Sequence, residues 1–204
     1  MTRKIYIGFE GPIGAGKTTL AQLLANHLDA EAILENVDGN EFLADFYQKR
    51  ERWALPMQLW FLADRHRQLS SLKSNDHRWF VADYTYAKDA IFARHLLHGR
   101  ELSLYNHLSS ALTATVKEPD LTVYLDANDD TLLERIKRRG RNYEQHIDET
   151  YLDSVRESYE TYLAAEKALN VFRFNTSLLN LDDRMEMNEL YERIVEAVER
   201  KNGK

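Results

Sequence analysis

Residues 11–19 read GPIGAGKTT, and the first eight of them fit the template G-x-x-x-x-G-K-[ST] of a phosphate-binding loop (P-loop). The apolar residues 4–9 before this loop predict a short strand, and the apolar side chains within residues 20–28 recur at helical spacing. A strand, a glycine-rich loop and a helix in this order are typical of a nucleoside-triphosphate site. A chance glycine turn before a helix is the alternative, but both flanking segments match the motif.

The chemistry of phosphate binding explains why these residue types occur in this order. Glycines let the backbone wrap round an anion without Cβ clashes, and a helix N-terminus directs partial positive charge towards it. Lys17 adds a full charge near the β- and γ-phosphates, and the Thr18 hydroxyl is a ligand for Mg²⁺. We therefore expect ATP and Mg²⁺ as cofactors, with the triphosphate bound by Gly11, Gly14, Ala15, Gly16, Lys17, Thr18 and Thr19.

Length and composition restrict the class of protein. At 204 residues the chain is long enough for one well-cored domain, and we expect a single domain over residues 1–204. The formal net charge of −6 argues against a nucleic-acid partner. The absence of cysteine excludes disulfides and fits a reducing compartment. With no signal-peptide pattern and no apolar run near the roughly 18 residues of a membrane helix, we expect a cytoplasmic protein without a membrane partner.

Strand and helix patterns alternate along the rest of the chain. Besides 4–9, four short apolar runs predict strands, at 31–35, 79–83, 121–126 and 171–175. Helical patterns separate them, at 40–50, about 56–72, after 83, 101–116, from 132, 148–169 and 183–201. This alternation predicts an α/β fold, in which helices cover both faces of a five-stranded parallel sheet. Because proline suits the first turn of a helix, we expect the helix at about 56–72, the third in the chain when residues 20–28 are counted, to begin near Pro56.

Carboxylates close two of the predicted strands. The carboxyl ends of strands in an open parallel sheet face the ligand crevice, so Glu35 and Asp83 are expected beside the phosphate loop. Asp83 is the natural acidic partner of Thr18 at a metal, with helix capping as the alternative. Position alone leaves Glu35 equally open to a role as a solvent-exposed side chain.

Polar side chains on one helix face have two interpretations. Gln58, Leu62 and Arg65 lie at i, i+4 and i+7 and so share a face. Gln58 and Arg65 are either a pair that reads a base or residues at the edge of an apolar stripe. The pattern alone favours the second interpretation.

Residues 135–141 read RIKRRGR, the densest basic run in an otherwise acidic chain. Cations are common at helix C-termini, so a solvated helix end is one interpretation. The other is a lid over about residues 135–147 that places arginines on a transferring phosphoryl group, since guanidinium forks suit phosphate oxygens. In a chain with a phosphate loop, the lid is favoured.

At several separated points in the right order, the residues resemble the deoxynucleoside kinases, in particular the bacterial deoxyadenosine/deoxyguanosine kinase-like branch. The resemblance covers most of the chain. It is carried by the phosphate loop, Glu35, Tyr47, Glu51-Arg52-Trp53, Gln58, Arg65, Arg135, Arg139, Arg141 and Glu144. It implies a P-loop NTPase fold, a kinase domain over residues 1–204, transfer of the ATP γ-phosphate to the 5′-hydroxyl of a deoxynucleoside, and a homodimer. We expect the helices at 101–116 and 148–169 to form its interface.

The resemblance also implies a role for each matching residue. Glu35 is the general base, Lys17, Arg139 and Arg141 act on the transferred group, and Arg135 and Arg139 bind ATP. Tyr47 and Glu144 hold the sugar 3′-hydroxyl, Thr18 and Asp83 hold the metal, and Gln58, Arg65 and Asp89 select the base. An amide beside an arginine–aspartate pair favours a base with an amino group. We therefore expect deoxyadenosine or deoxyguanosine, with deoxycytidine next.

One position departs from the family pattern. After the third strand the family has an acidic residue, then arginine, then serine, whereas this chain has Asp83-Tyr84-Thr85. Lys88, one helical turn beyond Tyr84, offers a replacement charge, although a lysine cannot reproduce a bidentate fork.

Two alternative functions follow from these residues. A nucleoside monophosphate kinase of the thymidylate kinase type shares the loop and lid, but the Glu35 carboxylate would repel its substrate's phosphate. The tyrosine at position 84 also leaves open a P-loop protein that binds nucleotide without catalysis.

Overall fold

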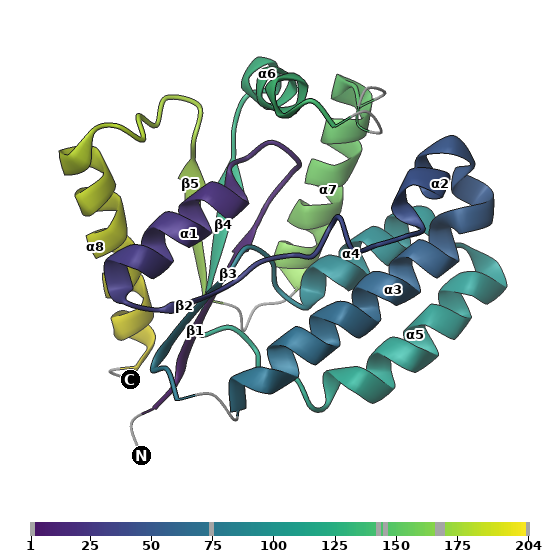
Figure 1. Cartoon of the computed structure of the whole chain (residues 1–204), viewed down its shortest axis with the longest axis horizontal. Coiled ribbons are helices and arrows are strands. Elements are labelled where there is room, and N and C mark those ends of the chain that lie inside the picture. The colour runs from purple at the N-terminus through teal and green to yellow at the C-terminus, as the bar shows by residue number, and fades with distance from the viewer. Residues whose placement is uncertain (1–2, 74–75, 142–143, 145–146, 166–169, 203–204) are drawn as a thin grey trace.

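Figure 1 shows the computed structural model of the chain, which describes residues 3–73, 76–141, 144, 147–165 and 170–202. Its strands form one five-stranded sheet in the order β2-β3-β1-β4-β5, and every neighbouring pair is parallel. The strand bounds are β1 (Ile5–Glu10), β2 (Glu31–Ile33), β3 (Trp79–Ala82), β4 (Leu121–Asp126) and β5 (Val171–Asn175). The predicted five-stranded parallel sheet is confirmed.

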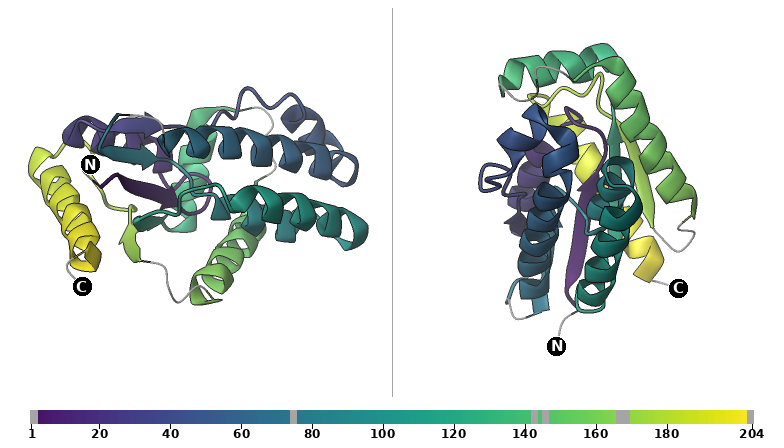
Figure 2. Two further views of the ribbon diagram at one scale, coloured as in Figure 1. Left: turned by 90° about the horizontal axis from the view of Figure 1, so that it is seen from below. Right: turned by 90° about the vertical axis from the view of Figure 1, so that its right-hand side faces the viewer.

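Helices connect the strands and pack on both sides of them (Figure 2). Their bounds are α1 (Lys17–Leu28), α2 (Leu43–Gln48), α3 (Arg50–Ser70), α4 (Ala87–Leu96), α5 (Gly99–Thr113), α6 (Asp129–Arg139), α7 (Glu149–Ala165) and α8 (Arg184–Asn202), with a 3₁₀ turn at Ser71–Lys73. Within the described ranges, no helix combines the length and the apolar composition that crossing a membrane requires.

The side chains of the central strands alternate between two buried clusters. Ile7 of β1 packs in a cluster with Leu24 of α1 and Ile194 of α8. The neighbouring Tyr6 points the other way, into a cluster with Leu69 of α3. Since successive strand residues face opposite sides of a sheet, the two faces are both buried, which explains the nearly continuous apolar strands.

A third cluster lies among helices rather than against the sheet. It joins Phe46 of α2, Met57 and Leu62 of α3, Leu97 directly after α4, and Tyr105 of α5. These contacts hold α2, α3 and α5 together as a helical layer to the right of the sheet in Figure 1. The layer supplies one wall of the cleft described below.

The predicted start of the third helix near Pro56 is wrong. The helix α3 begins at Arg50, and the Lys49 carbonyl accepts hydrogen bonds from the backbone amides of Arg52 and Trp53 at 3.1 and 3.2 Å. A proline inside a helix loses one backbone hydrogen bond. Burial of the α3 side chains on either side of Pro56 outweighs that loss, so the helix continues through it.

The strand predicted at 31–35 is shorter in the structure, where β2 ends at Ile33. Beyond Ile33, the chain is held by hydrogen bonds to Asp83 instead of by strand pairing. The Ile33 carbonyl accepts a hydrogen bond from the Asp83 amide at 3.1 Å, and the Asp83 carboxylate then accepts one from the Glu35 amide at 2.8 Å. Glu35 therefore follows the strand by two residues instead of closing it. It still lies at the carboxyl edge of the sheet.

Candidate active site

A cleft of about 850 Å³ opens at the carboxyl ends of the parallel strands, beneath α6 in the upper part of Figure 1. Both its place and its size are typical of ligand sites in such folds. Most of the predicted site residues line it: Gly11, Gly14, Ala15, Gly16, Lys17, Thr18, Thr19, Glu35, Tyr47, Gln58, Arg65, Asp83, Arg135, Arg139, Arg141 and Glu144. Asp89 does not line the cleft and lies behind Arg65.

The phosphate loop forms one end of the cleft, directly before α1. The Lys17 Nζ donates hydrogen bonds to the carbonyls of Gly11 and Pro12, both at 2.8 Å. Burial and the nearby ammonium of Lys88 together lower the pKa of Lys17 to about 7, against the opposing effect of surrounding carboxylates. A polyanion in the loop would stabilise the charged form of Lys17.

Two loop glycines differ in what a side chain would meet, which gives a matched test. Gly11 has φ +139°, and a Cβ there would lie 2.0 Å from the Leu125 carbonyl oxygen, whereas Gly16 has φ +93° and open space. We expect Gly16→Ala to lower the free energy of unfolding by about 1–2 kcal/mol through backbone strain alone. Gly11→Ala adds a backbone clash and should cost about 3 kcal/mol or more. Urea unfolding measures both, and equal losses would contradict this packing.

A chain of contacts joins the phosphate loop to Glu35. The Thr18 hydroxyl donates a hydrogen bond to one Asp83 oxygen at 2.6 Å, and the other Asp83 oxygen accepts from the Glu35 amide. The carboxylate and the hydroxyl thus converge on one point beside Lys17, as oxygen ligands of a magnesium ion do. No cluster of three or more His, Cys, Asp or Glu side chains suited to a metal occurs among the described residues, so a metal here would depend on phosphate oxygens as well.

The Glu35 carboxylate is held by two cations. Its Oε1 accepts from Arg65 Nε at 3.2 Å and from Arg65 Nη2, and its Oε2 accepts from Lys88 Nζ at 2.7 Å. Burial alone would raise the pKa of Glu35, but Lys88 and Arg65 outweigh it and hold the pKa well below its usual range. Glu35 is therefore ionised and faces the cleft.

Arg65 is shared between Glu35 and a second carboxylate. Its Nη1 donates to Asp89 Oδ1, while Asp89 Oδ2 has no hydrogen-bond partner among the described residues. Asp89 is fully buried, and burial raises its pKa to about 6 despite the opposing effect of Arg65. Asp89 thus supports Arg65 from behind, and in this arrangement it does not reach the cleft.

The deep end of the cleft combines one amide with an apolar wall. The buried Gln58 amide has no hydrogen-bond partner in the part of the chain that the structure describes. The wall around it includes Phe92, which lies near the base-packing aromatic of the family that the chain resembles. Its other members were not predicted from the sequence: Leu43, Phe46, Met57, Phe61 and Leu96. An apolar stripe on a helix is the only local signal of such residues, and it does not separate cleft lining from core.

Arginines and a glutamate of the predicted lid line the opposite side. Arg139 holds both oxygens of Glu144, with Nη2 at 2.7 and 2.6 Å. Arg135 donates to the Thr176 hydroxyl and carbonyl, both at 2.8 Å. Arg141 lies 3.7 Å from Glu144. Four residues of the predicted lid, 142, 143, 145 and 146, lie outside the described residues.

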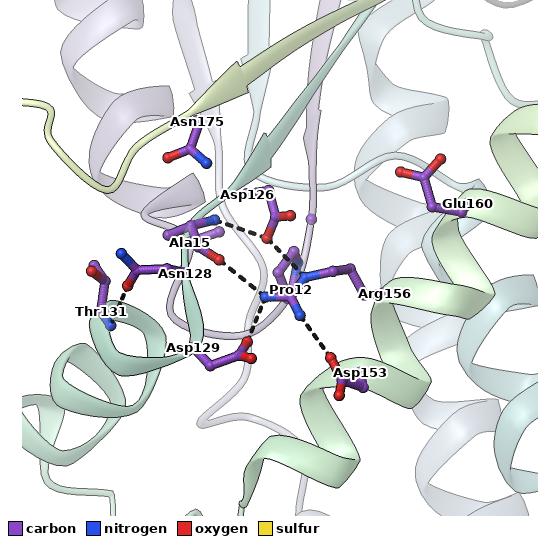
Figure 3. A network of polar contacts seen from close by, with 12 residues as sticks. Pro12, Ala15, Asp126, Asn128, Asp129, Thr131, Asp153, Arg156, Glu160 and Asn175 are labelled. Atoms are coloured by element: carbon purple, nitrogen blue, oxygen red, sulfur yellow. Dashed lines mark hydrogen bonds and ion pairs between the residues drawn. The ribbon is translucent and has the colours of Figure 1, made fainter.

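The start of α6 is fixed by an arginine of α7 (Figure 3). Arg156 reaches Asp126 at the end of β4 at 3.2 Å and Asp129 in the first turn of α6 at 2.7 Å. The Asn128 side chain caps the helix by accepting from the Thr131 amide at 2.8 Å. These contacts tie the first turn of α6 to the sheet, while its arginines lie at the other end of the helix, over the cleft.

Tyr84, at the position where the family has arginine, points away from the cleft. Its side chain is fully buried, and its hydroxyl donates to Gln68 Oε1 at 2.7 Å. Its ring lies 5.7 Å from the Arg65 guanidinium. The side chain at position 84 therefore brings no charge to the cleft, and Lys88, which the sequence suggested as a replacement charge, lies beside Glu35 instead.

Comparisons with known proteins agree with this geometry. A family model described as deoxynucleoside kinase matches residues 7–201. The chain is 36% identical to a deoxyguanosine kinase of Bacillus subtilis (strain 168) over 160 residues, 76% of each chain. It is 30% identical to a deoxyadenosine/deoxycytidine kinase of the same strain over 186 residues, 86% of each. Its fold resembles a deoxyadenosine kinase from M. mycoides solved with dCMP and dCDP, with a TM-score of 0.81 at 22% identity, covering 94% of this chain and all of that one.

Proposed function

The chain belongs to the deoxynucleoside kinase family, and we propose that its cleft transfers the γ-phosphate of ATP to the 5′-hydroxyl of a purine deoxynucleoside. The observation that carries this proposal is the ionised Glu35 carboxylate, which faces the cleft and is joined to the phosphate loop through Asp83 and Thr18. A carboxylate in this place suits a hydroxyl acceptor, because it accepts the hydroxyl's proton and repels a phosphate.

In the proposed reaction, Glu35 takes the proton of the 5′-hydroxyl as that oxygen bonds to the γ-phosphorus. The bond from the γ-phosphorus to its bridging oxygen breaks, and ADP leaves with the electron pair. Lys17 and the arginines at positions 139 and 141 offset the charge on the transferred group. Each of these side chains lines the cleft, which supports their roles.

Thr18 and Asp83 are the residues that would hold Mg²⁺. Their oxygens converge at 2.6 Å, and magnesium favours one or two protein oxygens together with phosphates and water. When bound, the metal neutralises charge on the β- and γ-phosphates. The Asp83 carboxylate also accepts a hydrogen bond from the Glu35 backbone amide. Asp83 therefore positions Glu35, the proposed base, relative to the residues that would hold the metal.

Base selection is assigned to the deep, apolar end of the cleft. The walls, which include Phe61 and Phe92, suit a flat ring, and the Gln58 amide offers both a donor and an acceptor. Arg65 lines the cleft from the same helix, and its nitrogens already donate to Glu35 and Asp89. An amide pairs with the N1/N6 or N7/N6 edge of adenine and with the N1/O6 edge of guanine, so it suits deoxyadenosine or deoxyguanosine. The relatives described above are named for these nucleosides and for deoxycytidine.

An ADP-release assay with ATP, Mg²⁺ and each of the four deoxynucleosides tests this assignment. We expect the highest kcat/KM with deoxyadenosine or deoxyguanosine, and a lower value with deoxycytidine. A preference for thymidine would contradict the purine assignment, because thymine is a pyrimidine and has no exocyclic amino group.

ATP binding should take up a proton at mildly alkaline pH. The pKa of Lys17 is about 7 in the free protein, so this side chain is mostly neutral at pH 8. The triphosphate favours the charged form and raises that pKa again, so binding adds about one proton. Calorimetric titration in buffers of different ionisation enthalpy measures the uptake. Lys17→Met should abolish it, and uptake that persists in this variant would assign the proton to another group.

We also propose that two copies of the chain associate through the helices predicted for the interface. On α5, Leu104 and Leu108 lie one turn apart and are 47% and 39% exposed, which supports a helix-packing contact there. Analytical ultracentrifugation tests it: a dimer that Leu104→Glu dissociates is expected, whereas a dimer unaffected by this change would move the interface elsewhere.

A further inference from the structure

Lys88 lies in the cleft at the place where two substrates would meet. It is in the first turn of α4, its side chain is 12% exposed, and its Nζ is 2.7 Å from Glu35 Oε2. The same ammonium lies 5.9 Å from the centre of the Phe92 ring, which lines the cleft. It is therefore a largely buried cation between the base-binding wall and the carboxylate that accepts the proton.

The two carboxylate oxygens of Glu35 are each bound by a different cation, and the two cations differ in how many other contacts hold them. Arg65 occupies Oε1 and is fixed from behind by the buried Asp89. Lys88 occupies Oε2 through a single contact at the end of a flexible four-carbon chain. A 5′-hydroxyl that donates to Glu35 needs one of these oxygens. Lys88 is the partner that can move aside without breaking a second buried ion pair.

The positive charge of Lys88 also favours a contact with the phosphates of the bound triphosphate. The side chains of Lys88 and Lys17 line the same cleft, so their like charges repel each other. A triphosphate held by Lys17 would place anionic oxygens between them and remove this repulsion. The cation that leaves Glu35 would then have a new counter-ion nearby.

We propose that Lys88 is a second phosphate-binding cation, which passes from Glu35 to the terminal phosphate of the triphosphate when the 5′-hydroxyl takes its place on Oε2. This inference rests on the proposed function. Lys88 keeps its proton throughout, while the hydroxyl proton passes to Glu35 and the phosphoryl group passes to the 5′-oxygen. The exchange explains how a carboxylate held by two cations becomes free to act as a base.

The test compares binding of ADP with binding of a non-hydrolysable imido analogue of ATP. Lys88→Met should weaken binding of the analogue by about tenfold or more and leave ADP binding nearly unchanged, because only the analogue carries the terminal phosphate. The same variant should lower kcat by about 10²–10³, as loss of one charge-stabilising donor does. Lys88→Arg keeps the charge and should restore much of the analogue's affinity.

Two further variants make the result decisive. Lys88→Gln keeps a hydrogen-bond donor for Glu35 and removes the charge, so it carries the test if the methionine variant does not fold. Lys49→Met, an exposed lysine outside the cleft, is the matched control and should behave as the unmodified protein. Equal loss of ADP and analogue binding, or no loss of either, would overturn the proposal. If no deoxynucleoside is phosphorylated by the unmodified protein, the proposed function fails, while the ratio of the two affinities still tests Lys88.

Discussion

Glu35→Gln is expected to lower kcat by about 10²–10⁴, because the amide cannot accept the proton of the 5′-hydroxyl. ATP binding should change little, because the side chain of Lys17 is held by the carbonyls of Gly11 and Pro12 in the phosphate loop and not by Glu35. The substitution keeps the shape of the side chain and leaves the hydrogen bond from its backbone amide to Asp83 in place. The loss therefore reports on the charge and basicity of this one group.

Steady-state kinetics and ATP titration of the same preparation measure the two quantities. The matched control is Glu101→Gln, an exposed glutamate in the first turn of α5, which should retain the native kcat. Near-native kcat for Glu35→Gln would remove the assignment of the general base. Loss of ATP binding in parallel with kcat would indicate that Glu35 shapes the phosphate site instead.

Arg65→Met is expected to lower the free energy of unfolding by about 3–5 kcal/mol, as removal of one partner from a buried ion pair does. Arg65 is 3% exposed and sits between Glu35 and the fully buried Asp89. The pKa of Asp89 is already about 6 with Arg65 present, and Arg65 lowers it. Without the guanidinium, burial would keep Asp89 protonated to still higher pH.

A double-mutant cycle isolates this coupling. We expect Asp89→Asn to restore part of the stability that Arg65→Met removes, because the unpaired buried carboxyl is then gone. Because the pKa of Asp89 is raised in the folded state, its protonation stabilises that state increasingly as pH falls towards about 4. The Arg65→Met variant should therefore gain stability relative to the unmodified protein between pH 7.5 and pH 6. Additive losses in the cycle, with no such pH effect, would contradict a shared network.

A control on the same helix separates burial from charge. Arg67 is 72% exposed on its side chain and pairs with Asp64 at the surface. Arg67→Met should change stability little, since exposed ion pairs contribute little. A loss as large as that of Arg65→Met would mean that disruption of α3, rather than the buried network, explains both.

The sequence predicted those parts of the fold that local pattern determines. The strand Leu121–Asp126 has the bounds expected from its apolar run, and the phosphate loop lies directly before α1 as the motif requires. Glu35 and Asp83 reach the same edge of the sheet because the carboxyl ends of parallel strands meet there. The helix start predicted at Pro56 was wrong, because the helical preference and the burial of the neighbouring residues outweigh the tendency of proline to begin a helix.

The rest of the site depends on contacts between distant segments. Lys88 and Glu35 are 53 residues apart and meet because α4 starts beside the end of β2. Nothing in the local sequence distinguishes the cleft-lining Phe61 and Phe92 from core residues at the same helical spacing. Asp89 lies behind Arg65 because α3 packs on α4. The resemblance to the family implied a role for Asp89 in base selection but did not indicate this position.

The most direct test of the proposed kinase activity compares the two kinds of acceptor in one assay. ADP release is measured with ATP and Mg²⁺ and, in separate reactions, each deoxynucleoside or each deoxynucleoside monophosphate. Turnover is expected with the deoxynucleosides alone, because the Glu35 carboxylate accepts a proton from a hydroxyl and repels a phosphate. Turnover with a monophosphate alone would contradict it, since Arg65 and Lys88 would then hold the acceptor's phosphate and Glu35 would not be the base.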